Sequence, residues 1–262
     1  MTRATRKRPE RIKLGRLPID IVDEAGALEE IAALVERGEG GLVFTPNVDH
    51  VVESEQNAAF AEAYASVSLS LIDGMAVLWA CRMLGSTAAQ KLSGSDLISP
   101  LMRLAATRGW RVFLLGGAPG VTERAGQLLP IEAPGLQIVG TSSPAIYMNH
   151  PREAREGVTR ILRTARPDLV LLAFGSPKGE LLAHELREAI PSVVFIGVGA
   201  GLDFLTGVVR RAPRWVSSIG LEWLFRLVKE PGRLWRRYLV RGPRFFPILI
   251  RALLARRGFG KR

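Results

Sequence analysis

The chain has 262 residues, 47% of them hydrophobic, and this composition excludes a wholly disordered protein. Its single cysteine, Cys81, excludes an intramolecular disulfide framework, and no uncharged apolar stretch reaches the roughly 18 residues of a membrane-spanning helix. The net charge of +11 is unevenly spread: residues 206–262 hold 15 Lys and Arg against 2 Glu, a net +13, and the rest of the chain carries −2. We therefore expect an anionic partner at the C-terminal end.

The first 16 residues are basic and lead into no long apolar run. We expect a disordered arm here rather than a signal peptide. From residue 17 to residue 205, short apolar runs alternate with helical patterns. The runs predicted as strands are residues 41–45, 66–72, 110–116, 136–140, 168–175 and 192–199. The helical patterns between them cover residues 48–65, 75–85, 95–108, 121–129, 151–165 and 178–190.

Several of these strands are apolar on both faces, which is typical of a parallel sheet covered by helices on each side. The sequence therefore predicts an α/β catalytic domain over residues 17–205, with a largely parallel, Rossmann-like sheet. Residues 206–262 differ: they are predicted as a basic, tryptophan-bearing helical appendage, with helices broken at Pro213, Pro231, Pro243 and Pro247.

Ligands of open parallel sheets bind beyond the carboxyl ends of the strands. The turn "LLGGAPG" places Gly116 and Gly117 before a helix for which Thr122 is the expected N-cap. Its free amides could hold a phosphate, or the segment is only a tight turn. In "AFGSPKGE", Ser176 is the expected N-cap beside Lys178, and this is either an anion site or a well-capped helix.

Asp73 in "SLSLIDGMAVLWA" is a carboxylate at the end of a predicted strand. It could cap the following helix, or it could act as a general base. His50, His150 and His184 are far apart and are each predicted to be structural or exposed. Without a cluster of His, Cys and Asp residues, we expect no metal and no cofactor.

One long run, "GVGAGLDFLTGVVRRAPRWVSSIGLEWLFRLVKEPGRLWRRYL", is more specific than any of these short motifs. Together with "TPNVDHVV", "DGMAVLWACRMLG", "LSGSDL", "FLLGGAPG" and "FGSPKGE", in this order, it resembles the WecG/TagA/CpsF family of bacterial glycosyltransferases. The resemblance covers roughly residues 12 to 245.

The resemblance implies inverting transfer of a sugar from a UDP-sugar donor to a polyprenyl-diphosphate-linked saccharide. The donor sugar would be N-acetylmannosamine, its uronic acid or another hexose, used in cell-surface polysaccharide synthesis. The enzyme would be a peripheral protein on the cytoplasmic face of the bacterial inner membrane, bound to its anionic surface. A homo-oligomer is left open.

The family's catalytic base matches Asp73, and one base is sufficient for a single displacement at the anomeric carbon. The strand ends and the family motifs together give the expected substrate-binding residues Thr45, Asn47, Gly74, Lys91, Gly94, Asp96, Gly116, Gly117, Lys178, Glu180 and Asp203. The expected contacts with the acceptor diphosphate are Arg226, Arg233 and Arg236.

The chain departs from the family pattern at two positions. Lys91 replaces the usual arginine. This replacement keeps the positive charge but loses the guanidinium group, which can donate two parallel hydrogen bonds to one anionic group. Gly179 replaces a glutamine, and this loss of an amide puts the identity of the donor in doubt.

Two alternative functions are considered. A dehydrogenase or another nucleotide-dependent enzyme is disfavoured because a GxGxxG motif with an acidic residue about 20 positions later is missing. A nucleic-acid-binding protein is suggested by the basic tail, which holds 8 of the 18 aromatic residues. However, Trp215, Trp223 and Phe225 share the tail with apolar Leu221, Leu224 and Leu227, which suits packing or a membrane interface better, so we expect no nucleic acid partner.

Overall fold

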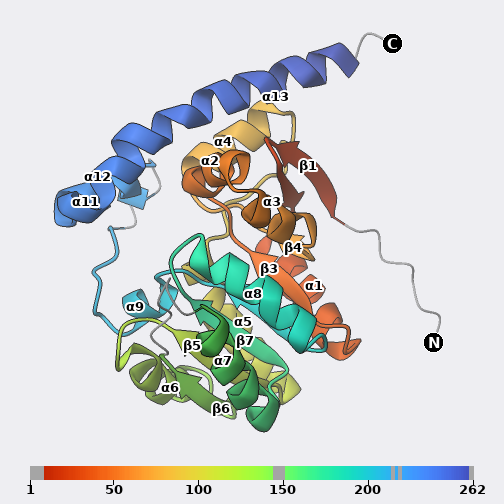
Figure 1. Cartoon of the computed structure of the whole chain (residues 1–262), viewed down its shortest axis with the longest axis vertical. Coiled ribbons are helices and arrows are strands. Elements are labelled where there is room, and N and C mark those ends of the chain that lie inside the picture. Colours follow the sequence, from red (N-terminus) through yellow and green to blue (C-terminus); the bar gives the residue numbers. More distant parts are fainter. Residues whose placement is uncertain (1–8, 144–150, 214–215, 218–219, 260–262) are drawn as a thin grey trace.

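The computed structural model describes residues 9–143, 151–213, 216–217 and 220–259 (Figure 1). A parallel six-stranded sheet forms its centre, with strand order β4-β3-β8-β7-β5-β6. The strands are β3 (Gly41–Phe44), β4 (Leu69–Ser70), β5 (Arg111–Gly116), β6 (Gln137–Ser142), β7 (Leu169–Ala173) and β8 (Val194–Gly197). Each lies within or beside a predicted run, so the predicted α/β fold with a parallel sheet is confirmed.

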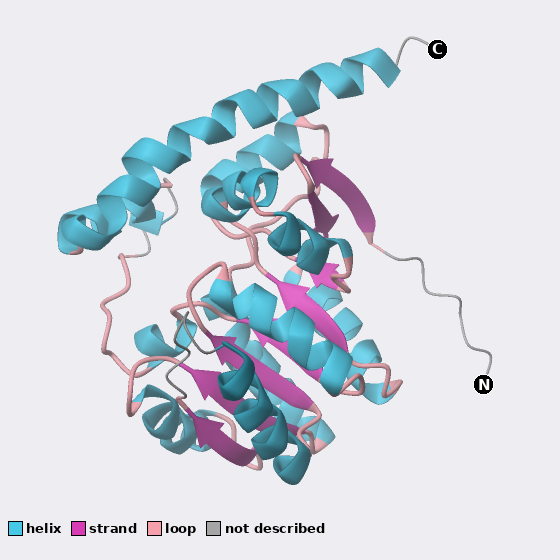
Figure 2. Ribbon diagram, in the orientation of Figure 1, coloured by secondary structure: helices cyan, strands magenta, loops and turns pink. Residues whose placement is uncertain are grey.

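Helices pack on both faces of this sheet (Figure 2). They are α1 (Glu24–Glu36), α2 (Val48–Gln56), α3 (Ala58–Ala65), α4 (Met75–Met83), α5 (Gly94–Arg108), α6 (Val121–Glu132), α7 (Pro151–Ala165), α8 (Lys178–Ala189) and α9 (Gly201–Leu205). Leu42 and Phe44 of β3 belong to the hydrophobic cluster that contains α3, α7 and α8, and Val43 to the cluster with α1, α5 and α6. Successive strand residues therefore bury opposite faces, as the apolar runs predict.

Two predicted N-caps are wrong, and one predicted helix is two helices. Gly120, not Thr122, is the N-cap of α6, and the buried Thr122 hydroxyl instead bonds Ser143 Oγ at 2.7 Å. Pro177, not Ser176, is the N-cap of α8. The pattern over residues 48–65 is two helices, because Asn57 ends α2 and its side chain caps α3 by accepting from the Phe60 amide at 3.1 Å.

The predicted disorder of residues 1–16 is wrong for its last part. β1 (Glu10–Leu14) and β2 (Leu17–Ile21) form an antiparallel hairpin. Arg11 donates to both carboxylate oxygens of the buried Asp20, at 2.7 and 2.8 Å. Asp20 also accepts from the Ser70 amide of β4 at 2.8 Å, which ties the hairpin to the sheet. Residues 1–8 lie outside the described residues.

The C-terminal appendage of residues 206–262 includes the helices α11 (Glu222–Lys229), α12 (Pro231–Trp235) and α13 (Phe245–Phe259). The helix break predicted at Pro231 is confirmed, because α11 ends just before it and α12 begins at it, but Pro243 and Pro247 do not break a helix. A π-helical stretch (Arg236–Arg241) and a short 3₁₀ turn (Gly242–Arg244) carry the chain past Pro243, which has no amide to donate. In Figure 1, α12 to α13 consequently form one long rod.

This rod is part of the hydrophobic core. Phe245, Ile248 and Leu249 of α13 are buried in the same cluster as Leu14 of the hairpin and Val51 of α2. Figure 1 shows the rod lying beside α2 and the N-terminal hairpin. Within the described part of the chain, we find no helix whose length and apolar character would let it cross a membrane.

Candidate active site

The carboxyl ends of β3 and its two neighbours, β4 and β8, meet at one edge of the sheet. Thr45 Oγ1, just after β3, donates to the carbonyl of Gly197 in β8 at 3.4 Å. The Asp73 amide donates to the Pro46 carbonyl at 3.0 Å, and Asn47 Nδ2 donates to Asp73 Oδ2 at 3.4 Å. The predicted residues Thr45, Asn47 and Asp73 are therefore brought together, because parallel strands end at the same edge.

Asp73 does not cap α4, because the N-cap position is occupied by Gly74. Its carboxylate is partly buried, and burial, assisted by the charge of Glu222, raises its pKa above the ordinary value. Lys91 and the Asn47 hydrogen bond act in the opposite direction without cancelling the effect. A raised pKa suits a general base, whereas helix capping would lower it. Of the two alternatives for Asp73, the geometry favours the base.

Asp96, in the first turn of α5, has the opposite electrostatic character. Lys91 Nζ lies 3.0 Å from its carboxylate, Ser93 Oγ donates to it at 2.6 Å, and Arg211 also pairs with it. Burial raises the pKa of this carboxyl, but the hydrogen bonds from Ser93, Arg211 and Lys91 outweigh it and lower the pKa to about 2. Asp96 is therefore a permanent anion that holds two cations at this end of α5.

Gly94, beside this cluster, is required by packing. A Cβ atom at Gly94 would lie 2.8 Å from the Val198 Cα, just after β8. Only glycine allows this approach of α5 to the strand end. Gly116 is similar: its φ is +106°, and a Cβ would lie 2.7 Å from the Ala173 carbonyl. The Gly117 amide donates to that carbonyl at 2.7 Å, so it is already bonded within the fold.

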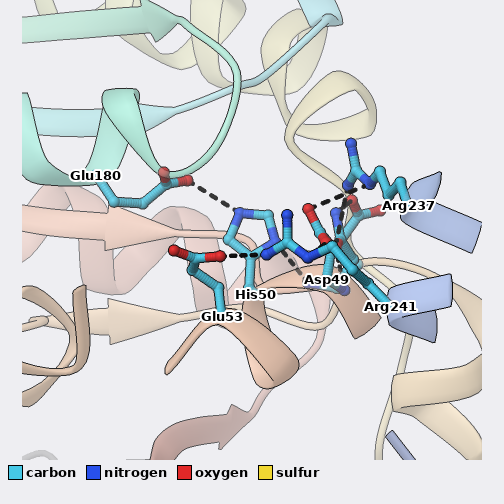
Figure 3. A network of polar contacts seen from close by, with 8 residues as sticks. Asp49, His50, Glu53, Glu180, Arg237 and Arg241 are labelled. Carbon is cyan, nitrogen blue, oxygen red and sulfur yellow. Dashed lines mark hydrogen bonds and ion pairs between the residues drawn. The ribbon is translucent and has the colours of Figure 1, made fainter. Parts of the chain in front are cut away.

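Two arginines of the π-helical stretch reach the site from the appendage (Figure 3). Arg237 Nη2 donates to Asn47 Oδ1 at 3.3 Å, and its Nε lies 3.3 Å from Asp49 Oδ2. Arg241 Nε lies 3.5 Å from Asp49 Oδ1, and Arg241 also pairs with Glu53. The appendage is therefore joined to α2 beside the residue that contacts Asp73.

The arginines predicted for the acceptor diphosphate lie in the same appendage. Arg226 of α11 lies over the Phe204 ring at 5.8 Å, and its Nε is buried without a hydrogen-bond partner among the described residues. Arg236 is exposed and lies over the Trp235 ring at 5.3 Å. Arg233 belongs to α12, and its side chain lies outside the described residues.

The residues at the start of α8 differ in their exposure to solvent. Lys178 is exposed at the helix start, whereas Glu180 is buried and faces His50. His50 Nε2 lies 3.0 Å from Glu180 Oε1 (Figure 3). Gly179 is buried, and a Cβ there would lie 3.2 Å from the Phe174 Cβ. Asp203 lies in the first turn of α9.

Four side chains of this region were missed by the sequence analysis as site residues: His50, Arg211, Arg237 and Arg241. The spacing Asn47-x-x-His50 is that of a capping box and could have indicated His50. No local signal distinguishes the three arginines from the other basic residues of the tail. Across the described residues, no group of three or more His, Cys, Asp or Glu side chains could hold a metal ion.

These residues place a partly buried carboxylate and several cations beyond the carboxyl ends of a parallel sheet, which is the usual ligand-binding place of α/β enzymes. Comparison with known proteins agrees with this class. The family model of the glycosyl transferase WecG/TagA/CpsF family matches residues 12–258, so the chain belongs to this family and is a glycosyltransferase.

Two curated relatives have the same name, N-acetylglucosaminyldiphosphoundecaprenol N-acetyl-beta-D-mannosaminyltransferase. The protein from Bacillus spizizenii (strain W23) is 30% identical over 205 residues, which are 78% of this chain and 77% of the relative. The protein from Bacillus subtilis (strain 168) is 28% identical over 200 residues, 76% of this chain and 75% of the relative.

Proposed function

We propose that this glycosyltransferase moves a hexose from a UDP-sugar to a polyprenyl-diphosphate-linked saccharide, with inversion at the anomeric carbon. The observation that carries the proposal is the single carboxylate Asp73 at the strand ends, held by Asn47 and kept at a raised pKa. The names of the two Bacillus relatives support a diphosphoundecaprenol-linked acceptor and N-acetylmannosamine as the transferred sugar.

The reaction is a single displacement in this proposal. The acceptor hydroxyl oxygen attacks the anomeric carbon of the donor, and its proton passes to the Asp73 carboxylate. The bond from the anomeric carbon to the diphosphate oxygen breaks, and UDP leaves with the electron pair. One base is sufficient, because no covalent glycosyl-enzyme forms in an inverting step.

Fixed cations supply the countercharge for the leaving group. Lys91 and Arg211 lie beside Asp96, and Arg237 lies beside Asn47. Preorganised positive groups of this kind stabilise charge that develops in the transition state. We therefore expect turnover to survive EDTA; loss of turnover that Mg²⁺ or Mn²⁺ restores would contradict this part of the proposal.

We further propose that the enzyme is peripheral on the cytoplasmic face of the bacterial inner membrane. The side chains of Trp235, Leu239, Phe246, Ile250 and Leu254 are exposed along the rod from α12 to α13. Exposed Arg244 and Arg256 accompany them. An apolar helix face flanked by arginines suits the interface of an anionic bilayer.

The nucleic-acid alternative is less well supported. Arg241 and Arg251 of the tail pair with Glu53 and Glu55 of α2. These arginines therefore form ion pairs within the fold and do not form an exposed basic strip that would bind the phosphates of a nucleic acid.

The test is a transfer assay with a UDP-sugar panel and a short-chain polyprenyl-diphosphate-linked acceptor, read by mass spectrometry. Asp73→Asn should lower kcat at least roughly 10²-fold and leave donor binding intact, because it removes only the base. Since the pKa of Asp73 is raised, its ionised form destabilises the fold at neutral pH, so Asp73→Asn should not lower Tm. Near-normal turnover of this variant would exclude Asp73 as the base.

A further inference from the structure

His50 and Glu180 form a buried pair that the proposed reaction does not use. They belong to α2 and α8, and only 7% and 8% of their surfaces are exposed. His50 Nε2 and Glu180 Oε1 are 3.0 Å apart. The His50 ring packs against Phe60 and Tyr64, with centroids 5.8 and 6.3 Å away, so its orientation is fixed by the core.

The protonation of the His50 ring follows from its two partners. The Asn47 backbone amide donates to His50 Nδ1 at 3.2 Å, so Nδ1 is an acceptor and carries no proton. The ring proton therefore lies on Nε2, which donates it to Glu180. The Glu180 carboxylate favours this tautomer, and the tautomer in turn holds the Asn47 backbone.

Asn47 is the link between this pair and Asp73. Its Oδ1 accepts from the Asp49 amide at 3.0 Å and from Arg237 Nη2 at 3.3 Å. With Oδ1 occupied by two donors, its amide nitrogen faces the Asp73 carboxylate, 3.4 Å away. A continuous chain of hydrogen bonds therefore runs from Glu180 through His50 and Asn47 to Asp73.

We propose that His50 and Glu180 are positioning residues, which fix the backbone of Asn47 and thereby the orientation of the Asp73 carboxylate toward the acceptor hydroxyl. This inference rests on the proposed role of Asp73 as the base. It also changes the role expected for Glu180. Because this carboxylate is buried against His50, we assign it to positioning the site rather than to binding the sugar. Small displacements of a reacting group cost large factors in rate, so loss of the pair should act on kcat.

Two variants of His50 separate positioning from packing. His50→Leu removes both hydrogen bonds, and we expect kcat to fall roughly 10-fold or more with donor KM unchanged. His50→Gln restores an acceptor for the Asn47 amide, because glutamine at this helix position is the usual capping-box partner, and should recover much of kcat. Glu180→Gln keeps the shape of the buried side chain and should lower kcat less than His50→Leu does.

His184→Leu is the matched control. His184 lies on α8, like Glu180, and its Nδ1 is 3.0 Å from Ser66 Oγ, so this variant also removes a histidine hydrogen bond but none to Asn47. Its kcat should equal that of the wild type. Equal kcat in folded His50→Leu, or the same loss in His184→Leu, would overturn the proposal.

Nitrogen-15 NMR of the histidine rings supplies a readout that needs no activity. In the wild type, His50 should show a protonated Nε2 and an unprotonated Nδ1 at neutral pH, and Glu180→Gln should shift the Nε2 signal. A proton on Nδ1 would overturn the inference even in an active enzyme. Absence of transfer by the wild type with every donor would instead contradict the proposed function and leave the NMR result to decide the tautomer.

Discussion

At the scale of single residues, the hydrogen bond from Asn47 to Asp73 predicts a pH dependence. In the proposed reaction Asp73 acts as a base only when it is ionised, so activity should fall as the pH drops through its raised pKa. The Asn47 hydrogen bond lowers this pKa. Asn47→Ala removes it, so the acid limb of kcat/KM should move to higher pH. The measurement is the pH profile of kcat/KM of both proteins.

Thr45→Val is the control for this shift. Thr45 lies at the same strand end, but its hydroxyl donates to Gly197 rather than to Asp73. The variant can change the size of kcat/KM, yet its acid limb should stay at the wild-type position. An acid limb that does not move in Asn47→Ala would mean that another group sets it.

At the scale of elements, the contact between α2 and the rod predicts a salt-sensitive joint. Glu53 pairs with Arg241, and Glu55 Oε2 lies 2.5 Å from Arg251 Nη2. Pairs that are partly open to solvent are worth roughly 1 kcal/mol or less and weaken with ionic strength. Glu53→Gln should therefore speed amide hydrogen exchange in α12 and α13 while exchange in β5 and β7 stays unchanged.

The exposed Glu62 of α3 provides the matched substitution for this experiment. Glu62→Gln removes the same charge from the neighbouring helix and should leave exchange in the rod unaltered. If both variants behave alike, the effect comes from net charge and not from the joint.

Elements also show what the sequence can and cannot predict. The six parallel strands could be predicted from the apolar runs between helical patterns, because buried strands differ from their surroundings in composition. The hairpin of β1 and β2 was missed, because its signal is the pairing of Arg11 with the buried Asp20, whose carboxylate in turn accepts from the amide of the distant Ser70. Asp73 and Asn47 could be predicted as site residues because they lie just after predicted strands. Arg237 could not, because only the packing of the rod against α2 brings this arginine, rather than another one of the tail, to Asn47.

At the scale of the whole molecule, the exposed face of the rod predicts vesicle binding. Phe246, Ile250 and Leu254 are 64%, 56% and 62% exposed, so replacing all three by serine should not unfold the protein. The wild type should sediment with phosphatidylglycerol-containing vesicles, because each basic residue near an anionic surface contributes about 1 kcal/mol. The triple variant should lose most of this binding, since its apolar contact is gone.

The matched control is Ile131→Ser, which changes an equally exposed apolar side chain of α6, 76% exposed. It should bind vesicles as the wild type does. Binding by the triple variant at the wild-type level would show that this face does not enter the bilayer.

The packing of α13 against the N-terminal hairpin also has a consequence for how the protein is made. Phe245, Ile248 and Leu249 complete a core that contains Leu14 and Val51, which leave the ribosome more than 190 residues earlier. Until α13 has been synthesised, the nascent chain therefore exposes the apolar residues that α13 later buries. Chaperones or the bilayer itself can shield this surface during that time. Since Arg237 follows Asn47 by 190 residues, Asn47 gains its appendage contact only after that length of chain has also been synthesised. The candidate active site is consequently completed only after the rod itself has been synthesised.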